Sequence, residues 1–339
     1  MELVRMFGDA HTTLRPPILR GPEAKNAPIQ LYLFTEGLFV TAAAPEHADL
    51  AGAQVLKIGG HTVDETMKAL DRILSRDNTM WPKLIAPGMM VNPLILNGLG
   101  LIPAADRVTY TVRDAGGKER EVELEAKEGE VTDQWALARD REHPPLYLKH
   151  LAPHWFEYLP EQKLLYCQYA AVQDQPDQTV AQFFEKVFQF VDENDVERLV
   201  LDMRRNGGGN LFLNQPLIHG LIRHEKIDRL GRLFVIIGRA TFSAAVSGVG
   251  KINANTNAIF VGEPIGSPPN FVGESIPVKL PYSKLTGSIS DLYWQNTVAM
   301  DYRTWIAPAL YTPPSFALLK AGRDPAMEAI LEYIKANPS

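Results

Sequence analysis

The sequence predicts an α/β protein in which a small β-rich module precedes a larger domain with a mostly parallel sheet. Residues 163–261 alternate short apolar runs with amphipathic segments of helical period, the pattern of a parallel sheet covered by helices. Residues 28–125 instead carry short strands and glycine turns. A chain of 339 residues is also too long for one ordinary core, so we expect two domains.

The expected domain boundaries follow these changes in sequence pattern. They give an N-terminal segment over 1–27, the β-rich module over 28–125, a linker rich in proline and aromatic residues over 126–160, and the α/β domain over 161–339. We expect the N-terminal segment to pack on the α/β domain.

The β-rich module is predicted to contain a strand, a helix and a hairpin in that order. Residues 31–43 alternate around Gly37 and indicate a strand, and residues 64–75 place their apolar side chains on one helical face. The Ala115-Gly116-Gly117 turn between two alternating runs predicts a hairpin. This order resembles a PDZ domain, which captures an extended peptide by strand addition. A module of the same shape with an unused groove is the alternative.

Composition excludes several classes of partner. The net charge of −6 gives no electrostatic reason to expect nucleic acid or an anionic membrane surface. Residues 84–103 are long enough to cross a bilayer, but prolines, glycines and asparagines interrupt them, so we interpret them as irregular, buried or lid-like chain and expect no membrane span. The first residues show no signal-peptide pattern. Cys167, the single cysteine, lies in an apolar run and is expected in the core.

The α/β domain is expected to bring two turns together at one edge of its sheet. Predicted strands begin near Lys163, Val196, Leu233 and Ala258, and helices are predicted over 179–194, 213–223 and 243–253. A closing helix begins at Asp324-Pro325, a good N-cap followed by proline at the first helical position. Because parallel strands share their carboxyl edge, residues 204–209 and 239–243 should meet there.

Ser243 stands between the predicted strand at 233–237 and the helix that follows it. A serine at this junction lies near unpaired N–H groups and the positive end of the helix dipole, both of which favour a developing oxyanion. Serine is also a preferred N-cap residue for its own reasons. On this stretch alone, a helix cap and a nucleophile are both open interpretations.

No pattern predicts a metal or a cofactor. His150, His154 and Glu157 have superficially the spacing of a zinc-binding helix, but Pro153 argues against a regular helix there. The glycine run at 207–209 lacks the following Gly-Lys-Ser/Thr of a phosphate-binding loop. We therefore expect neither a cofactor nor a metal ion.

Three stretches resemble segments of the C-terminal-processing (tail-specific) serine peptidase family. They are LVLDMRRNGGGN at 199–210, ATFSAAVSGVGKIN at 240–253 and AIFVGEPIG at 258–266. The resemblance implies a β/α spiral core of the crotonase and Clp-protease type with a preceding or inserted PDZ domain. It implies Ser243 as the nucleophile, with oxyanion donors at the N–H of Ala244 and at a glycine of the run, Gly207 or Gly208.

The general base distinguishes two branches of that family. The Ser-Lys branch has a lysine after the glycine that ends the third stretch, where this chain has Ser267. Lys251 lies about 12 Å from Ser243 by helical rise and is a poor base. The tricorn-like branch uses a histidine within a D-x-H-T segment, and GDAHTTL at 8–14 is similar to it. The resemblance therefore implies His11 as the general base.

The same branch implies an acidic residue that orients the histidine, roughly sixty positions after the serine. Asp301 is the nearest match, although the family usually has glutamate there and the proline-aspartate segment that should follow is missing. Asp9 and Glu263 are the alternatives.

Together these residues predict a serine endopeptidase that cleaves unstructured peptides or protein C-terminal tails through an acyl-enzyme. The alternative is a family member that keeps the fold without turnover and binds peptides or apolar ligands. An α/β-hydrolase esterase is disfavoured because no G-x-S-x-G elbow is present. The expected partners are peptide or unfolded protein and, as an open option, further copies of the chain in a homo-oligomer. The resemblance implies export to the periplasm or the cell exterior.

Overall fold

A computed structural model describes residues 1–15, 24–128 and 132–337 of the protein. The chain forms two compact units, and each is made of three segments. Unit 1 contains 1–144, 272–292 and 314–323, and unit 2 contains 145–271, 293–313 and 324–339. Parts of the predicted N-terminal segment (16–23) and of the predicted linker (129–131) lie outside the described residues.

Unit 2 is built on a six-stranded sheet that is parallel except at one edge. Its strands, in spatial order, are β11 (His154–Leu159), β12 (Leu164–Tyr169), β13 (Arg198–Asp202), β14 (Leu233–Ile237), β15 (Ile259–Gly262) and β20 (Leu310–Tyr311). β11 pairs antiparallel with β12, and the remaining pairs are parallel. The mostly parallel sheet expected from the alternating sequence is confirmed.

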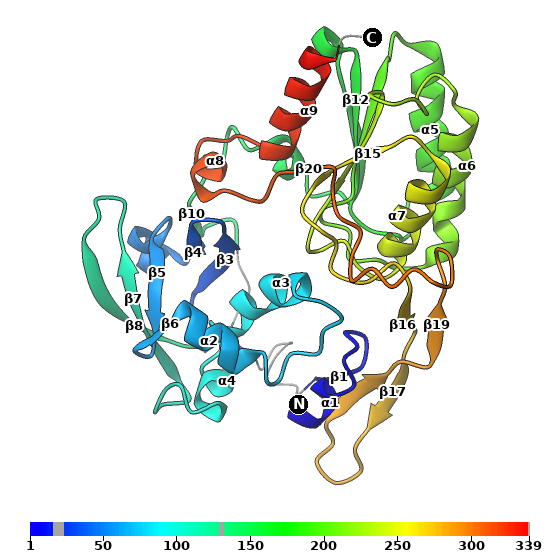
Figure 1. The fold of residues 1–339 in the computed structure, drawn as a ribbon. Helices are drawn as coiled ribbons and strands as arrows, with labels where there is room; N and C mark the ends of the chain where they lie inside the picture. The colour runs from blue at the N-terminus through cyan, green and yellow to red at the C-terminus, as the bar shows by residue number, and fades with distance from the viewer. Residues whose placement is uncertain (16–23, 129–131, 338–339) are drawn as a thin grey trace. The chain divides into compact units, whose positions relative to one another are not determined.

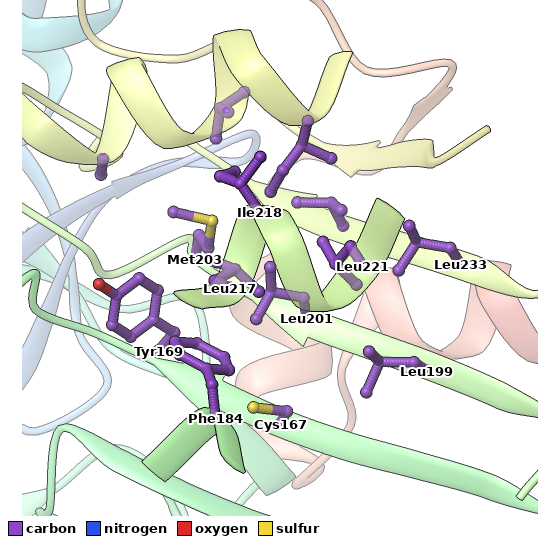
Figure 2. Packing of buried hydrophobic residues seen from close by; sticks show 14 of the residues in the cluster. Cys167, Tyr169, Phe184, Leu199, Leu201, Met203, Leu217, Ile218, Leu221 and Leu233 are labelled. Atoms are coloured by element: carbon purple, nitrogen blue, oxygen red, sulfur yellow. The ribbon is translucent and has the colours of Figure 1, made fainter. Parts of the chain in front are cut away.

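Helices cover both faces of this sheet (Figure 1). On one face lie α5 (Val180–Glu193), α6 (Gln215–Arg223) and α7 (Ala244–Asn255), and on the other lies α9 (Pro325–Ala336). Alternate residues of each strand pack into the hydrophobic cores on the two faces of the sheet, because successive side chains of a strand point to opposite faces. Leu199 and Leu201 therefore pack toward Phe184 and Leu217, as Figure 2 shows, whereas Val200 joins the core beneath α9.

Capping residues fix where these helices begin. Thr179 and Gln182 form a capping box at the start of α5, with the Gln182 N–H donating to Thr179 Oγ1 over 3.2 Å. At α9, the carboxylate of Asp324 accepts a hydrogen bond from the Ala326 N–H over 3.0 Å, and Pro325 occupies the first helical position. The prediction of a closing helix at Asp324-Pro325 is confirmed.

The predicted linker at 126–160 differs from the structure at its end. Residues 154–159 form β11, whose register pairs His154 with Tyr169 and Leu159 with Leu164. The aromatic side chains that suggested a linker are packing groups, since Phe156 and Tyr158 lie against the core beneath α5. This edge strand is half-exposed on its outer side, so it lacks the continuous apolar run that marks a central strand.

Unit 1 carries the β-rich module as a seven-stranded sheet. Its path runs through β10 (Ala136–Leu137), β4 (Gly37–Ala43), β5 (Gln54–Ile58), β7 (Arg107–Arg113) and β8 (Glu119–Glu125), with β3 (Ile29–Phe34) on β4 and β6 (His61–Thr62) on β5. β7 and β8 form the predicted hairpin, which is confirmed. Residues 31–43 are a hairpin of two strands and were wrongly predicted as one, because Gly37 at φ +128° opens β4 after a tight turn. The PDZ resemblance stays a prediction.

Residues 84–103 contain two short helices, which corrects their interpretation as irregular chain. α3 spans Met80–Met89 and tolerates Pro87, and α4 spans Pro93–Gly98 with its proline at the first helical position. The side chain of Asn92 caps α4 by accepting from the Ile95 N–H over 3.1 Å. Across the described ranges, no helix is long and apolar enough to cross a membrane.

Further elements of unit 1 bring together residues that are distant in the sequence. α1 (Glu2–Arg5) precedes β1 (Thr13–Arg15), which pairs with β18 (Thr286–Ile289), and β18 pairs in turn with β17 (Ile276–Lys279). The other elements are α2 (Val63–Leu70), the pair β2 (Lys25–Asn26) and β9 (Lys127–Glu128), and the pair β16 (Phe271–Gly273) and β19 (Leu292–Trp294), which lies where the chain passes between the units.

Glu36 anchors α8 (Phe316–Lys320) to the β-rich module. Its carboxylate accepts from the Ser315 hydroxyl over 2.6 Å and from the N–H groups of Phe316 and Ala317 over 3.1 and 3.2 Å. Although burial opposes the effect, these hydrogen bonds lower the pKa of Glu36 to about 2. The Phe316 ring also stacks on Phe39 with 4.0 Å between centroids, so hydrogen bonds and an apolar contact both hold α8 against the β-rich module.

Candidate active site

Ser243 joins β14 to α7 in a backbone conformation that serine rarely adopts. Its φ is +55° and its ψ is −127°, and no hydrogen bond from its side chain caps the helix. Such a conformation in a non-glycine residue costs about 1–3 kcal/mol and persists only where the surroundings impose it. The side chain is also only partly buried. The hydroxyl is therefore not used as a helix cap, and its geometry favours the other interpretation, a nucleophile.

The glycine run packs directly against Ser243. Gly208 has φ +105°, and a methyl group placed on it would lie 2.7 Å from Ser243 Cβ, 2.9 Å from Phe242 O and 3.0 Å from the Ala244 nitrogen. Only glycine fits at so close an approach with a positive φ. The two turns predicted to meet at the carboxyl edge of the sheet are thus in contact in unit 2.

Two backbone N–H groups beside the serine are open to a ligand. Among the described residues, no hydrogen-bond acceptor faces the N–H of Gly207 or that of Ala244. The N–H of Gly208, by contrast, donates to Asn206 Oδ1 over 3.0 Å. Of the glycine donors considered from the sequence, the geometry therefore favours Gly207 over Gly208, with Ala244 as the second donor.

Asn206 organises the glycine run and was missed by the sequence reasoning. It is fully buried, its Nδ2 donates to Tyr169 O over 2.8 Å, and its own carbonyl accepts from the Phe242 N–H over 3.0 Å. With the bond to Gly208, Asn206 links the glycine run to the residue before Ser243. An asparagine directly before three glycines is a turn signal that could have identified it.

A second asparagine supports the start of α7. Asn214 is buried, and its Nδ2 donates to Ala244 O over 2.8 Å, while its Oδ1 accepts from the Tyr169 hydroxyl over 3.2 Å. A Cβ on Gly248 would lie 3.2 Å from the Asn214 side chain, which explains a small residue one helical turn after Ala244. Nothing in the sequence pattern singled this residue out.

Glu263, an alternative partner for the histidine, is committed to a buried ion pair. Its two carboxylate oxygens accept from Arg239 Nε over 2.9 Å and from Arg239 Nη2 over 2.7 Å, and both side chains are about 95 % buried. Such a bidentate pair satisfies the charges of both groups at once. The pair joins the turn after β14, where Arg239 lies four positions before Ser243, to the residue after β15.

His11 lies in unit 1, in the turn that leads into β1. The carboxylate of Asp9 accepts from the N–H groups of His11 over 2.8 Å and of Thr12 over 3.2 Å, and also from the Ser290 hydroxyl over 3.1 Å. The hydroxyl of Ser288 donates to His11 O over 2.9 Å. Asp9 therefore fixes the backbone on either side of the histidine and ties it to the region of β18.

Asp301 lies in unit 2 and is held by its near neighbours. Its carboxylate accepts from the Arg303 guanidinium over 2.8 and 2.7 Å and from the Thr297 hydroxyl over 2.8 Å. The bonds from Arg303 outweigh the effect of burial and hold the pKa of Asp301 well below its usual range. The group is therefore a carboxylate at neutral pH.

A charged cluster lies at the end of β13, directly before the glycine run in the sequence. Arg204 donates to both oxygens of Asp324 over 2.8 Å each and also binds Asp202, and its guanidinium lies 4.3 Å from the centroid of the Tyr147 ring. Tyr166 donates to Asp202 over 2.7 Å, and burial, reinforced by that carboxylate, raises the pKa of the phenol well above its usual value. The cluster connects the sheet edge to the N-cap of α9.

The expectations about metal ligands and the cysteine concern residues in unit 2. His154 lies on a strand, where its Nε2 pairs with Ala171 O over 2.7 Å. Cys167 is fully buried, as expected, and burial raises the pKa of its thiol far above its usual value. In the part of the chain that the structure describes, no group of histidine, cysteine, aspartate or glutamate residues is arranged to hold a metal ion.

Comparison with known proteins defines the class of fold. No model of a protein family matches the chain, and no curated protein does. Among solved structures, mature CPAF is 12% identical, with a TM-score of 0.67 over 100% of this chain and 87% of that chain. Mature CPAF complexed with lactacystin is 13% identical, with a TM-score of 0.67 over 99% of this chain and 86% of that chain.

A further similar structure is the photosystem II D1 C-terminal processing protease, 15% identical with a TM-score of 0.43 over 98% of this chain and 83% of that chain. The likeness to CPAF extends over the whole length of the chain and establishes the fold. The α/β core with a β-rich domain, which the family resemblance implied, is thereby confirmed.

Proposed function

We propose that the protein is a serine peptidase that cleaves unstructured peptides or protein tails, with Ser243 as its nucleophile. One observation carries the proposal. Ser243 keeps a strained backbone conformation in which its hydroxyl caps nothing, beside two N–H groups that have no acceptor among the described residues. A residue that served only as a cap would relax to an ordinary N-cap conformation.

The chemistry assigned to this site is acyl transfer. Ser243 Oγ attacks the peptide carbonyl carbon while its proton passes to a general base, and the carbonyl oxygen becomes an oxyanion that accepts from the Gly207 and Ala244 N–H groups. The proton then moves from the base to the leaving amine as the C–N bond breaks, which leaves an acyl-enzyme. Water, deprotonated by the same base, releases the acid and restores the hydroxyl.

His11 is the proposed base and Asp301 its proposed orienting carboxylate, both on the strength of the family resemblance. The geometry adds two supporting points. The backbone of His11 is fixed by Asp9 and Ser288, which limits the freedom of the ring, and Asp301 is kept ionised by Arg303. An ionised carboxylate stabilises the imidazolium that forms during attack. Asp9 accepts main-chain bonds, and Glu263 is bound by Arg239 much as Asp301 is bound by Arg303, so the resemblance alone ranks Asp301 first.

Peptide is the proposed substrate on the strength of the family resemblance, and the fold is shared with mature CPAF, which one solved structure shows complexed with lactacystin. The PDZ-like module of unit 1 would add recognition of extended chain by strand addition.

The test is covalent labelling of the full chain by a fluorophosphonate, read by intact mass, together with cleavage of an unstructured peptide library. We expect a single adduct on Ser243, no adduct for Ser243→Ala, and a labelling rate at least 100-fold lower for His11→Ala. Ser247→Ala is the matched control, since Ser247 lies one turn further along α7 and its hydroxyl is buried. A chain that binds peptides but is neither labelled nor able to cleave them would refute the peptidase and leave a binding scaffold.

A further inference from the structure

The turn from Gly238 to Phe242 has to impose on Ser243 a backbone conformation that the residue does not favour. We propose that Thr241 is the positioning residue that imposes it. This inference rests on the proposed function, because it concerns the reactivity of Ser243. Nothing in the sequence assigned a role to Thr241, which lies two positions before the serine.

All the hydrogen-bonding groups of Thr241 are used, and the residue is fully buried. Its Oγ1 donates to Met203 O over 2.9 Å and accepts from the Gly238 N–H over 3.1 Å. Its main-chain N–H donates to Gly238 O over 2.8 Å, and its carbonyl accepts from the Gly266 N–H over 3.0 Å. Because each polar group of this buried residue has a hydrogen-bond partner, Thr241 is held in one conformation.

These hydrogen bonds connect the three segments that follow the neighbouring strands β13, β14 and β15. Met203 directly follows β13, Gly238 directly follows β14, and Gly266 lies four residues after β15. The next residue, Phe242, donates its N–H to Asn206 O over 3.0 Å and so joins the same turn to the glycine run. Ser243 therefore enters α7 from a segment whose position is fixed against the strand ends that carry the oxyanion donors.

The alternative conformation of Ser243 is an ordinary N-cap. There the hydroxyl would accept from an N–H in the first turn of α7 and would no longer be available to attack a carbonyl. Relaxation to that conformation would also relieve the strain at φ +55°. Replacing the Thr241 hydroxyl by a methyl group leaves the Gly238 N–H without an acceptor. It also removes one of the two donors to Met203 O, where the Asn206 N–H remains at 3.0 Å. The bonds that oppose this relaxation are thereby lost.

The variants that test this are Thr241→Val, which keeps the shape, and Thr241→Ser, which keeps the hydroxyl. Thr256→Val is the matched control. Thr256 ends the same helix, and its hydroxyl makes the same kind of bonds, donating to Ile252 O over 2.8 Å and accepting from the Ala258 N–H over 3.4 Å. We expect fluorophosphonate labelling to slow at least tenfold in Thr241→Val and to change less than threefold in Thr241→Ser and Thr256→Val. Wild-type labelling speed in Thr241→Val would overturn the inference.

A structural readout separates this inference from the proposed function. If the wild-type chain is not labelled at all, the peptidase assignment fails, and a crystal structure of Thr241→Val then decides the role of Thr241. A shift of Ser243 to negative φ supports the inference, and retention of a φ near +55° overturns it. If Thr241→Val does not fold, Thr241→Cys, which is nearly the same size and has a weak donor, takes its place with the same expected outcomes.

Discussion

Replacement of Gly208 by alanine offers a quantitative test of the active-site geometry. Gly208 has φ +105°, which costs an alanine about 1–2 kcal/mol on its own. The added methyl group would lie 2.7 Å from Ser243 Cβ and 2.9 Å from the Phe242 carbonyl oxygen. Because these atoms belong to a tightly bonded turn, they cannot move aside easily, and overpacking adds about 1–3 kcal/mol. We expect a total loss of about 2–5 kcal/mol in the free energy of unfolding.

Under the proposed mechanism the displaced atoms take part in the reaction, so reactivity should fall as well. A shift of about 1 Å in a nucleophile or an oxyanion donor lowers the rate about 100-fold, and fluorophosphonate labelling of Ser243 should slow by that factor. Urea denaturation measures the stability and intact mass follows the labelling. Gly231→Ala is the control in the same unit, since Gly231 has φ +79° but its nearest contact to a new Cβ is 3.6 Å. Equal stability losses and equal labelling in both variants would refute the close packing of Gly208 on Ser243.

Three further outcomes follow from other contacts. The ionised Glu36 carboxylate stabilises the fold above pH 4.5, and this stabilisation is lost as the pH falls toward 2. Glu36→Gln should remove it, so the unfolding of unit 1, measured by far-ultraviolet circular dichroism, should become less sensitive to acid. Asn206→Ala, which leaves the Gly208 N–H and the Tyr169 carbonyl without partners, should cost about 2–4 kcal/mol in urea denaturation, and an unchanged midpoint would contradict its role. Burial lowers the pKa of His154 below 6.5, so protonation of the unfolded chain reduces stability as the pH falls below that value, and His154→Gln should flatten the dependence.

The parts of the fold that local pattern could predict are those with a strong period or cap. The buried strands around β13 and β14, the capped helix α5 and the hairpin β7–β8 all have continuous apolar runs, capping residues or a glycine turn, and each occurs where expected. The predictions for two stretches were wrong, for opposite reasons. The turn between β3 and β4 is too short to interrupt the alternation of 31–43, and α3 keeps a helical conformation despite Pro87 because its apolar side is buried in the core of unit 1.

The candidate site was predictable only in part. The meeting of the glycine run with the Ser243 turn follows from strand order, since both turns come after neighbouring parallel strands. Asn206 could have been identified from the turn signal before the glycines. The roles of Asn214 and Thr241 were not predictable, because they come from hydrogen bonds to carbonyls distant in the sequence. The choice between Gly207 and Gly208 as oxyanion donor likewise depends on a single side-chain bond, from the Gly208 N–H to Asn206.

The pairing of β1 with β18 sets the order in which parts of the chain can fold during synthesis. Thr13 pairs with Ser288, and the hydroxyl of Ser288 holds the carbonyl of His11, so the segment around the histidine gains its partner only after residue 288 has been synthesised. Closing a loop of that length is slow compared with forming the local hairpins of unit 1. A chain that ends before β18 would contain Ser243 and both oxyanion donors but would lack the strand that orders His11. Under the proposed mechanism, an incomplete chain on the ribosome therefore has a nucleophile without a positioned base.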